Sequence, residues 1–305
     1  MSQLIPFFNV VLDTILPIFL IIGITILLNR WLPLNVHTLS RLSIYLFSPA
    51  LFLSNISQTE LATKDVTVIL AAAAVLCVTM ALIGTAVTRL MRYERALASA
   101  FVLTAFIMNT VNFGFPFLEF ALGPEALDTA VVFTVAQANV AYILGTWIAS
   151  RGKSSPRVAL RNVLTIPMPY AFAIALFLNV NDTPLPLPVL RAADVLSRAI
   201  VPTALVILGL QLSGATLNGR WRPILTATFT RFVIGSTAAI AIAALFGLQG
   251  LTRQVFILEG SMPAGVLSGV LSTEFGGDAE FAAATILFTT VLSAIFLSGL
   301  LLFVT

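Results

Sequence analysis

The sequence predicts an all-α integral membrane protein with ten transmembrane helices, arranged as two inverted repeats of five. Composition is the first reason, since 59% of the 305 residues are hydrophobic and only 10% are charged, whereas soluble domains carry about 25% charged residues. The second reason is a series of about ten apolar segments, each near the roughly 20 residues that a spanning helix needs. The third is that glycine, proline and amide residues interrupt two of these segments.

The apolar segments follow one another with short connections. We expect spanning helices at residues 7–30, 38–57, 65–90, 95–121, 126–149, 157–179, 190–213, 222–247, 252–275 and 279–303. The first five form a repeat over residues 1–150, and the last five form a second repeat over residues 151–305. Because five is an odd number, the second repeat must enter the membrane in the opposite direction, as in many secondary transporters.

Basic residues predict the orientation, because cytoplasmic connections are enriched in Lys and Arg. With the N-terminus outside, the outer side holds four of them, Lys64, Arg191, Arg198 and Arg253. The cytoplasmic side then holds eleven, Arg30, Arg41, Arg89, Arg92, Arg95, Arg151, Lys153, Arg157, Arg161, Arg220 and Arg222. We therefore expect a multi-pass protein of the plasma (inner) membrane with both termini outside the cytoplasm. The small net charge of +3 does not indicate a nucleic-acid partner.

The first interruption runs from Asn109 to Pro116, inside the segment at 95–121. An amide without a partner in hydrocarbon costs roughly 2–7 kcal/mol, and Pro116 removes a backbone donor and presses on the preceding turn. Irregular backbone is tolerated at membrane depth only where protein buries it or where it lines a watery cavity. We interpret this stretch as the broken helix of a transport site.

The second interruption runs from Gly260 to Gly265, around Pro263. Paired interruptions in the two halves of a chain are the sequence feature that best indicates a transporter's binding site. At 1.5 Å per residue, Asn109 lies about 20 Å above the inner end of its segment and Pro263 about 15 Å below the outer end of its own. The same estimate puts Gln137 about 18 Å deep, so that these residues share one layer of the membrane.

Pro49 and Pro202 also come out near this central layer, each following a Leu-Ser-Arg triplet in its repeat. The predicted substrate contacts are Asn109, Thr110, Asn112, Gly114, Gln137, Asn139, Ser261, Pro263 and Ala264. The predicted crossover and hinge residues are Pro116, Gly260, Pro263, Gly265, Pro49 and Pro202. Plainer interpretations stay open, because amides often bond neighbouring helices in a bundle and prolines often only kink a helix.

Ionisable residues within the apolar segments are open to two interpretations. Asp13 could serve as an ion or proton site, or extend its carboxylate to the headgroups. Glu119 and Glu259 are expected near the outer interface, in contact with water. Arg231 is expected to extend its long side chain to the inner headgroups. The central layer would then contain no lysine or arginine, which favours a monoanion, or a dicarboxylate carried with a proton or a cation, as the substrate.

Three stretches are the most distinctive: Asn109–Leu118 with Gly123, Val201–Leu212, and Met262–Gly265 followed by Glu274–Gly276. They resemble the fourth, seventh and ninth helices of the auxin efflux carrier family, which includes plant carriers and bacterial organic-acid permeases. The similarity runs over nearly the whole chain, although the plant carriers have proline where this chain has Met108. The resemblance implies crossing broken helices 4 and 9, a scaffold part and a transport part, an organic-anion substrate and a homodimer.

The function that the sequence predicts is secondary transport of small carboxylate anions by alternating access in an elevator-like motion. The carboxylate would bind between half-helix N-termini and the amides of Asn109, Asn112 and Gln137. No G-x-x-x-x-G-K-[ST] run is present, so a gradient of the substrate, or of a coupled proton or sodium ion, supplies the energy. No cofactor or metal is expected.

Three alternatives stay open, one of them another transporter and two of a different class. A sodium-coupled symporter of the bile-acid type would share the fold and require sodium for uptake. An anion channel would share the composition but show no saturation or counterflow. An intramembrane enzyme needs a nucleophile with a base or a pair of buried carboxylates, and one histidine in a connection, His37, with Cys77 in an apolar run argues against it.

Overall fold

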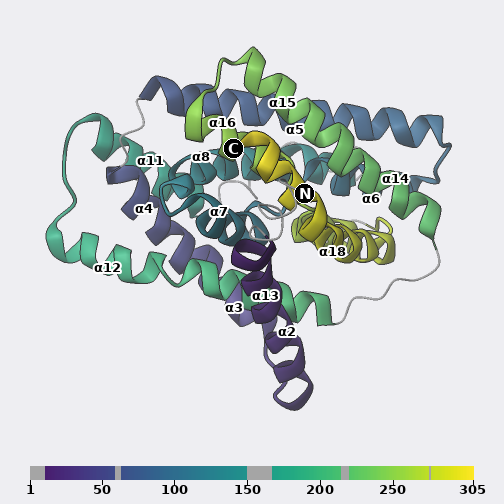
Figure 1. The fold of residues 1–305 in the computed structure, drawn as a ribbon, viewed down its shortest axis with the longest axis horizontal. Helices are drawn as coiled ribbons and strands as arrows, with labels where there is room; N and C mark the ends of the chain where they lie inside the picture. The colour runs from purple at the N-terminus through teal and green to yellow at the C-terminus, as the bar shows by residue number, and fades with distance from the viewer. Residues whose placement is uncertain (1–10, 59–62, 150–166, 214–219, 275) are drawn as a thin grey trace, which may run out of the picture.

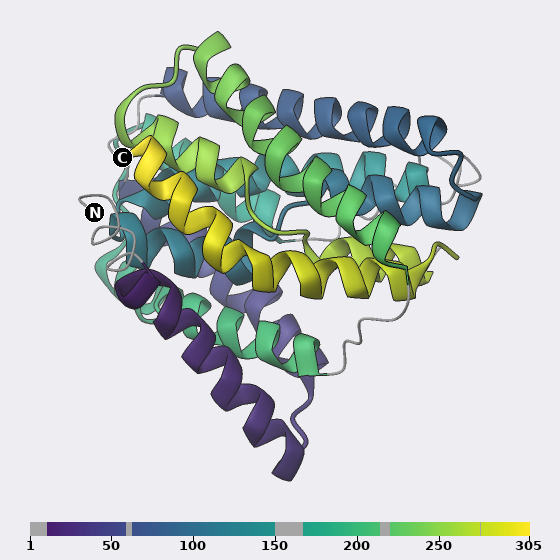
Figure 2. The same ribbon diagram turned by 45° about the vertical axis from the view of Figure 1, so that its right-hand side comes forward.

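The computed structural model describes residues 11–58, 63–149, 167–213, 220–274 and 276–305. All regular secondary structure within these ranges is helical, as Figures 1 and 2 show. Six helical stretches are long and apolar enough to cross a membrane, Val11–Trp31, Asp65–Leu90, Ala126–Gly145, Leu187–Ser213, Trp221–Leu245 and Ala279–Val304. The predicted class, an all-α multi-pass membrane protein, is therefore confirmed.

The first half contains η1 (Val11–Ile15), α2 (Leu16–Trp31), α3 (Val36–Leu42), η2 (Ser43–Phe47), α4 (Ser48–Gln58), α5 (Thr63–Leu90), α6 (Arg95–Phe106), η3 (Thr110–Gly114), α7 (Phe115–Leu122), α8 (Ala126–Val140), η4 (Ala141–Gly145) and α9 (Thr146–Ala149). The second half contains α11 (Met168–Val180), α12 (Leu187–Ser197), α13 (Ile200–Ser213), α14 (Trp221–Phe229), η5 (Thr230–Ile234), α15 (Gly235–Leu245), α16 (Gly250–Gly260), α17 (Val266–Glu274) and α18 (Ala279–Val304). The η segments are short π-helical turns, which occur mostly as local bulges in longer helices.

The helices agree well with the predicted segments, including the two interruptions. The first part of the segment at 157–179 lies outside the described residues. One further division, between α12 and α13, is not predicted by the sequence. Pro202 stands in the first turn of α13, directly after this division, and Pro49 stands in the first turn of α4, directly after η2. The position of Pro202 suits proline, because the first turn of a helix does not need its N–H, whereas Pro49 follows η2 without a gap, in a helical stretch that continues from α3.

The helices form two groups. In Figure 1 the first group, α2, α3, α4, α12 and α13, lies at the lower left, and α11 packs on α4. The second group contains α5, α6, α8, α14, α15, α16, α17 and α18, which contact one another above and to the right of it. The segment η3 packs on α13 of the first group and on α8 and α16 of the second. The first interruption therefore lies at the boundary between the two groups.

A close helix contact holds the first group together. On Gly209 of α13, a Cβ atom would lie 2.7 Å from Cβ of Thr25 and 3.0 Å from the carbonyl oxygen of Ile22, both in α2. Small residues that let two backbones approach are the usual basis of helix association in membranes. Thr25 is itself buried and donates its hydroxyl to the carbonyl oxygen of Ile21 at 2.8 Å.

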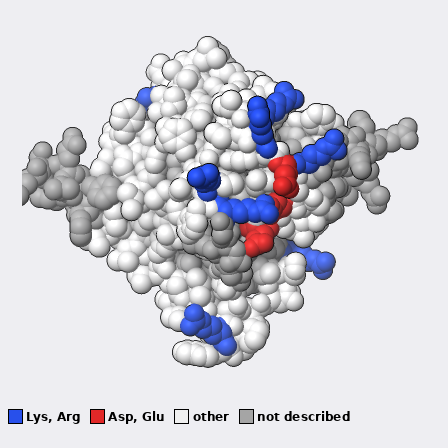
Figure 3. Space-filling model, turned by 90° about the vertical axis from the view of Figure 1, so that its right-hand side faces the viewer, with Lys and Arg blue, Asp and Glu red and all other residues white. Residues whose placement is uncertain are grey.

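Charged side chains gather at one end of the molecule, the face shown in Figure 3. At this end α5 finishes and α6, α14 and α18 begin. The charged residues at these helix ends are Arg89, Arg92, Glu94, Arg95, Arg220, Arg222, Asp278 and Glu280. Arg220 and Asp278 form an ion pair with a nitrogen–oxygen distance of 2.5 Å. The basic residues at these four helix ends, which the sequence assigns to one side of the membrane, thus lie on one face of the molecule.

The contact between α2 and α13 gives a first test. Replacing Gly209 by alanine should push these helices apart and lower the free energy of unfolding by about 1–3 kcal/mol, the usual cost of an added methyl group in a packed core. Gly23→Ala is the matched control, because a Cβ atom there meets nothing within 4 Å and alanine favours a helix. Thermal unfolding in detergent measures both variants, and equal midpoints would contradict the close approach.

Candidate functional site

The first interruption begins where α6 ends at Phe106. Ile107 is extended, with φ −91° and ψ 110°, and Asn109 has φ −86° and ψ 62°. The chain then turns through η3 into α7, and all residues from Ile107 to Thr110 are buried. Pro116, a predicted crossover residue, lies in the first turn of α7 and not within the extended stretch. The break is therefore centred on Met108.

The second interruption begins where α16 ends at Gly260 and lasts until α17 starts at Val266. All five residues from Ser261 to Gly265 are buried. Ser261 donates its hydroxyl to the carbonyl oxygen of Ile257 at 2.6 Å, within its own helix. Because Pro263 has no N–H to donate, it can sit in this stretch without leaving a buried donor unpaired.

The two interruptions cross and pair with each other. Met108 and Ala264 form an antiparallel β-bridge. The N–H of Asn109 donates to the carbonyl oxygen of Pro263 at 2.9 Å, and the N–H of Gly265 donates to that of Ile107 at 2.8 Å. Each break thus supplies hydrogen-bond partners for the other, which non-helical backbone needs at membrane depth. We call the stretches 107–109 and 261–265 the crossing.

Side chains from two neighbouring helices complete the crossing. The amide of Gln137, on α8, accepts from the N–H of Met108 at 3.1 Å and donates to its carbonyl oxygen at 2.9 Å. On the other side, the N–H of Ala264 donates to the hydroxyl of Thr289, on α18, at 3.2 Å. Both backbone groups of Met108 and the N–H of Ala264 are therefore bonded to side chains. The same Gln137 amide group also reaches the hydroxyl of Thr110, at 3.4 Å.

Gly265 is required by the close approach of the two backbones. A Cβ atom on it would lie 2.6 Å from the carbonyl oxygen of Met108 and 3.0 Å from Cγ2 of Ile107. No side chain fits at that distance without moving the opposite strand. The glycine in the second motif therefore has a steric reason.

Arg231 holds the ends of the two helices that lead into the crossing. It is fully buried, on η5, and its Nη1 donates to the carbonyl oxygen of Ala105 at 2.6 Å while its Nη2 donates to that of Gly260. Both oxygens belong to the last turns of α6 and α16, where carbonyls lack helical partners and carry partial negative charge. Gly235, one turn later, leaves room for the guanidinium, since a Cβ atom there would lie 2.6 Å from Nη2.

The position of Arg231 corrects two expectations from the sequence. Its side chain does not extend to the inner headgroups, and the central layer does contain a cation. The expectation was wrong because the two carbonyls that bind the guanidinium come from helices far apart in the sequence, and only the crossing brings them together. Its Nε has no hydrogen-bond partner in the described part of the chain.

Glu259 corrects a third expectation. It is fully buried rather than solvated, and neither carboxylate oxygen has a hydrogen-bond partner among the described residues. The carboxylate lies against Gly114, the last residue of η3, where a Cβ atom would come within 2.8 Å of Oε2 and 2.9 Å of Oε1. The expectation of solvation was wrong because packing of α16 against α5, α8 and α15 encloses this side chain within the protein.

The remaining predicted site residues fall into two classes. Asn109, Thr110 and Ser261 are buried at the crossing, and Nδ2 of Asn109 has no partner among the described residues. Asn112, on η3, is half-buried. Asn139 lies two residues after Gln137 on α8 and donates its side-chain amide to the carbonyl oxygen of Val135 at 2.8 Å, and Asp13 is exposed on η1.

Thr289 is a residue of the crossing that sequence reasoning missed. It belongs to a buried hydroxyl face of α18, with Thr285 one turn before it and Ser293 one turn after. A spacing of four residues places side chains on one face of a helix. Hydroxyls repeated at this spacing in an apolar segment were the signal that could have found it.

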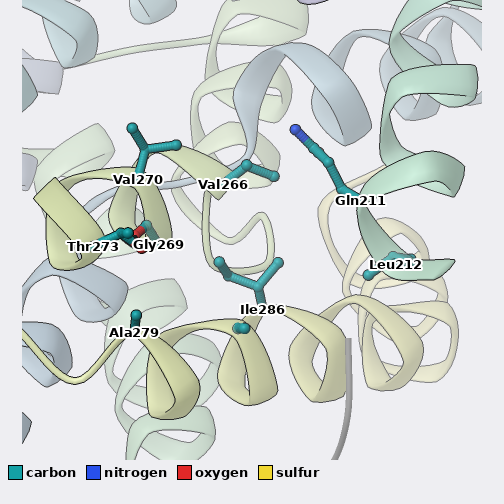
Figure 4. Close-up of a pocket in the computed structure, with 9 residues that line it drawn as sticks. Gln211, Leu212, Val266, Gly269, Val270, Thr273, Ala279 and Ile286 are labelled. Atoms are coloured by element: carbon teal, nitrogen blue, oxygen red, sulfur yellow. Dashed lines mark hydrogen bonds between the residues drawn. The ribbon is translucent and has the colours of Figure 1, made fainter. Parts of the chain in front are cut away.

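A cavity of about 250 Å³ lies beside the crossing, between the two helix groups. Figure 4 shows Gln211 extending from α13 toward α17, with Ile286 of α18 between them. The cavity begins at Val266, the first residue after the second interruption, and reaches Thr273 and Ala279 near the start of α18. Its walls are otherwise mostly apolar, and the side-chain oxygen of Gln211 has no hydrogen-bond partner among the described residues.

Two kinds of comparison with known proteins give matches. A family model described as "Membrane transport protein" matches residues 10–158 and again residues 151–301. An "Uncharacterized transporter" of Methanothermobacter thermautotrophicus is 24% identical over 266 residues, which are 86% of each chain. An uncharacterized transporter of Methanocaldococcus jannaschii is 26% identical over 197 residues, which are 63% of this chain and 64% of the relative. The alignment thus covers a little less than two thirds of that relative's length.

The clamp formed by Arg231 gives the second test. Arg231→Met should lower the free energy of unfolding by about 1–3 kcal/mol for each buried carbonyl left without a donor. Arg231→Lys should recover only part of this loss, because one ammonium lacks the planar fork that reaches two acceptors. Arg222→Met, at an exposed position, is the control. Thermal unfolding in detergent is the measurement, and a midpoint for Arg231→Met equal to that of the control would show that the clamp is unimportant.

Proposed function

This chain belongs to the auxin efflux carrier family of membrane transport proteins, and we propose that it is a secondary transporter of small carboxylate anions that works by alternating access. The observation that carries the proposal is the crossing. A spanning helix has no structural need for a break, so two breaks that meet at the same place indicate a site. Nδ2 of Asn109, a buried donor with no partner among the described residues, is the group there that a carboxylate would satisfy.

The proposed architecture is ten spanning helices in two inverted repeats, over 1–150 and 151–305. The double match of the family model supports it. The crossing supports it further, because each break is bonded by a side chain from the helix that comes after its broken helix. Met108 is bonded to Gln137 on α8, which comes after α7, and Ala264 is bonded to Thr289 on α18, which comes after α17. Equivalent helices thus perform equivalent tasks in the two halves.

The electrostatics of the crossing favour an anion. The helical segments that start there, η3 with α7 and α17, direct their N-terminal ends toward it, and helix N-termini attract negative charge through free N–H groups and the helix dipole. The opposite ends, the carbonyl termini of α6 and α16, are bonded to Arg231. The partial negative charge at the crossing is therefore neutralised while the partial positive charge is left for a ligand. A carboxylate accepting such bonds forms strong, charge-assisted hydrogen bonds.

The cavity beside the crossing provides the proposed route. It lies between α13 of the first helix group and α17 and α18 of the second, so a movement of one group past the other, as in an elevator, would open or close it. The basic face of Figure 3 lies at the start of α18, where the cavity ends. A basic surface raises the local concentration of an anionic substrate. By the excess of Lys and Arg on cytoplasmic connections, this face is cytoplasmic, which puts both termini outside.

We place the protein in the plasma (inner) membrane, as a homodimer by analogy with the family resemblance. A channel is the less favoured alternative, because channels usually build a pore on the axis of an oligomer and the crossing lies within one chain. A sodium-coupled symporter of the same fold is favoured by one observation, the carboxylate of Glu259, which has no hydrogen-bond partner in the described part of the chain.

Counterflow in proteoliposomes tests the proposal. Purified protein is reconstituted with a panel of unlabelled mono- and dicarboxylates inside, and uptake of the same labelled compounds is measured. At least one carboxylate should show saturable counterflow. Asn109→Ala should weaken its apparent affinity by about 1.5–3 kcal/mol, the range for a hydrogen bond to a charged group, which is roughly ten- to a hundredfold.

Asn181→Ala is the control for this experiment, since Asn181 is exposed in a turn after α11. Its affinity should match that of the wild type. Absence of counterflow for every carboxylate in the panel, with protein that is folded and correctly inserted, would overturn the proposed substrate class. Unchanged affinity in Asn109→Ala would remove Asn109 from the site.

A further inference from the structure

Glu259 is a buried acid that the proposed binding of an anion does not use. It stands one residue before the end of α16, and its neighbour Gly260 gives its carbonyl oxygen to Arg231. The Glu259 carboxylate itself lies against Gly114, where only the absence of a side chain leaves room for it. Neither of its oxygens has a hydrogen-bond partner among the described residues.

No described positive charge compensates this carboxylate. Arg231 gives its two terminal nitrogens to backbone carbonyls, and the one ion pair formed within the described ranges joins Arg220 and Asp278. The helices packed on α16 are α5, α8, α15 and α18, with η3. In the described segments, their ionisable residues are at helix ends, Lys64, Asp65, Arg89, Asp128 and Glu280, apart from the buried thiol of Cys77. Arg253, on α16 itself, lies almost two turns away and is half-buried.

A carboxylate in this position calls for a positive charge that the described residues do not supply. Transfer of an ion from water into a protein interior costs free energy that only a partner of opposite charge and good hydrogen bonds offset. Glu259 has neither among the described residues, and glycine opposite it keeps the space beside both oxygens free of a side chain. One unpaired negative charge calls for one monovalent cation.

We propose that Glu259, against Gly114, is the binding site of one monovalent cation, a proton or a sodium ion. The site is joined directly to the crossing, because η3 (Thr110–Gly114) follows Asn109 and the N–H of Gly114 donates to the carbonyl oxygen of Asn109 at 2.9 Å. A cation here changes the charge beside the segment that carries Asn109. Occupancy of this site therefore favours binding of an anion at the crossing, and that second step rests on the proposed function.

Thermal unfolding of the purified protein tests the site without any substrate. Wild type and Glu259→Gln are compared in detergent, in one series from 0 to about 200 mM NaCl with choline chloride keeping the ionic strength constant, and in another from pH 8 to pH 5 without sodium. A cation that binds the folded state raises the midpoint by mass action, and a shift of about 3 °C or more is expected for wild type. A shift with sodium assigns the site to sodium, and a shift with acid alone assigns it to a proton.

For the neutral variant Glu259→Gln, the direction of the change in unfolding temperature is predicted. Without sodium at pH 8, Glu259→Gln should unfold at the same temperature as wild type or higher, because it removes an unpaired charge, and its midpoint should no longer respond to the assigned cation. Glu119→Gln, a half-buried carboxyl on α7, is the control and should respond as wild type does. Equal responses of wild type and Glu259→Gln would overturn the proposal. Failure of Glu259→Gln to fold would do the same, since it would show that the carboxylate has a structural partner.

The outcome is independent of the transport assay. A cation response that requires Glu259, in protein that transports no carboxylate, would keep the cation site and reject the proposed substrate. Counterflow that proceeds with no cation response in wild type would keep the proposed function and reject the site. Where both are present, the apparent affinity for the carboxylate should fall at least tenfold when the assigned cation is withdrawn from wild type, and should not change in Glu259→Gln.

Discussion

The structure depends on the pairing of two broken backbones. A helix that stops at membrane depth leaves N–H and C=O groups with no water to bond them, and each must find a partner inside the protein. Here the two breaks supply each other, through the bonds from Asn109 to Pro263 and from Gly265 to Ile107. The N–H and the carbonyl oxygen of Met108 are bonded to Gln137, and the N–H of Ala264 is bonded to Thr289. The carbonyl ends of α6 and α16 are bonded to Arg231. The helices that lead into the breaks, α6 and α16, are thus held by Arg231, while the N-terminal ends of η3 and α17, which begin after the breaks, face the site.

The two buried charged residues near the crossing, Arg231 and Glu259, differ in whether other groups of the protein compensate their charge. Arg231 is compensated by carbonyl oxygens from two helix ends, so its burial contributes to the structure, although its Nε stays unpaired within the described residues. Glu259, one residue away from one of those helix ends, has no compensating group in the described ranges. Buried charges without partners cost several kcal/mol even after the protein relaxes, and intramembrane acids usually mark ion or substrate pathways. The contrast between the two residues is the physical basis for assigning a structural role to one and a ligand to the other.

The residue types within each segment predicted the two interruptions, whereas the contacts between helices could not be predicted from them. Amides, glycines and prolines in apolar segments indicate a break wherever they occur. Counting residues placed Asn109, Gln137 and Pro263 in the same layer, and in the structure Asn109 bonds to Pro263 while Gln137 bonds to Met108, the neighbour of Asn109. The bonds of Gln137 to backbone could not be predicted, because they depend on which face of α8 meets Met108. Arg231 and Glu259 were misplaced for a related reason: depth along a helix says nothing about the neighbour on each face. The crossover was also expected to include Pro116, which instead begins α7.

The pairing of the breaks can be measured directly by cross-linking. Met108 and Ala264 are a directly opposed pair without mutual hydrogen bonds, in which Cα atoms lie about 4.5 Å apart, within the range that a disulfide spans. Met108→Cys and Ala264→Cys are combined in a chain whose only cysteine, Cys77, is replaced by alanine, and free thiols are counted after mild oxidation and denaturation. We predict that both thiols disappear together, whereas Ala98→Cys with Ala264→Cys, separated by most of α6, keeps both. Two free thiols in the first pair, with the protein folded, would contradict the crossing and the site built on it.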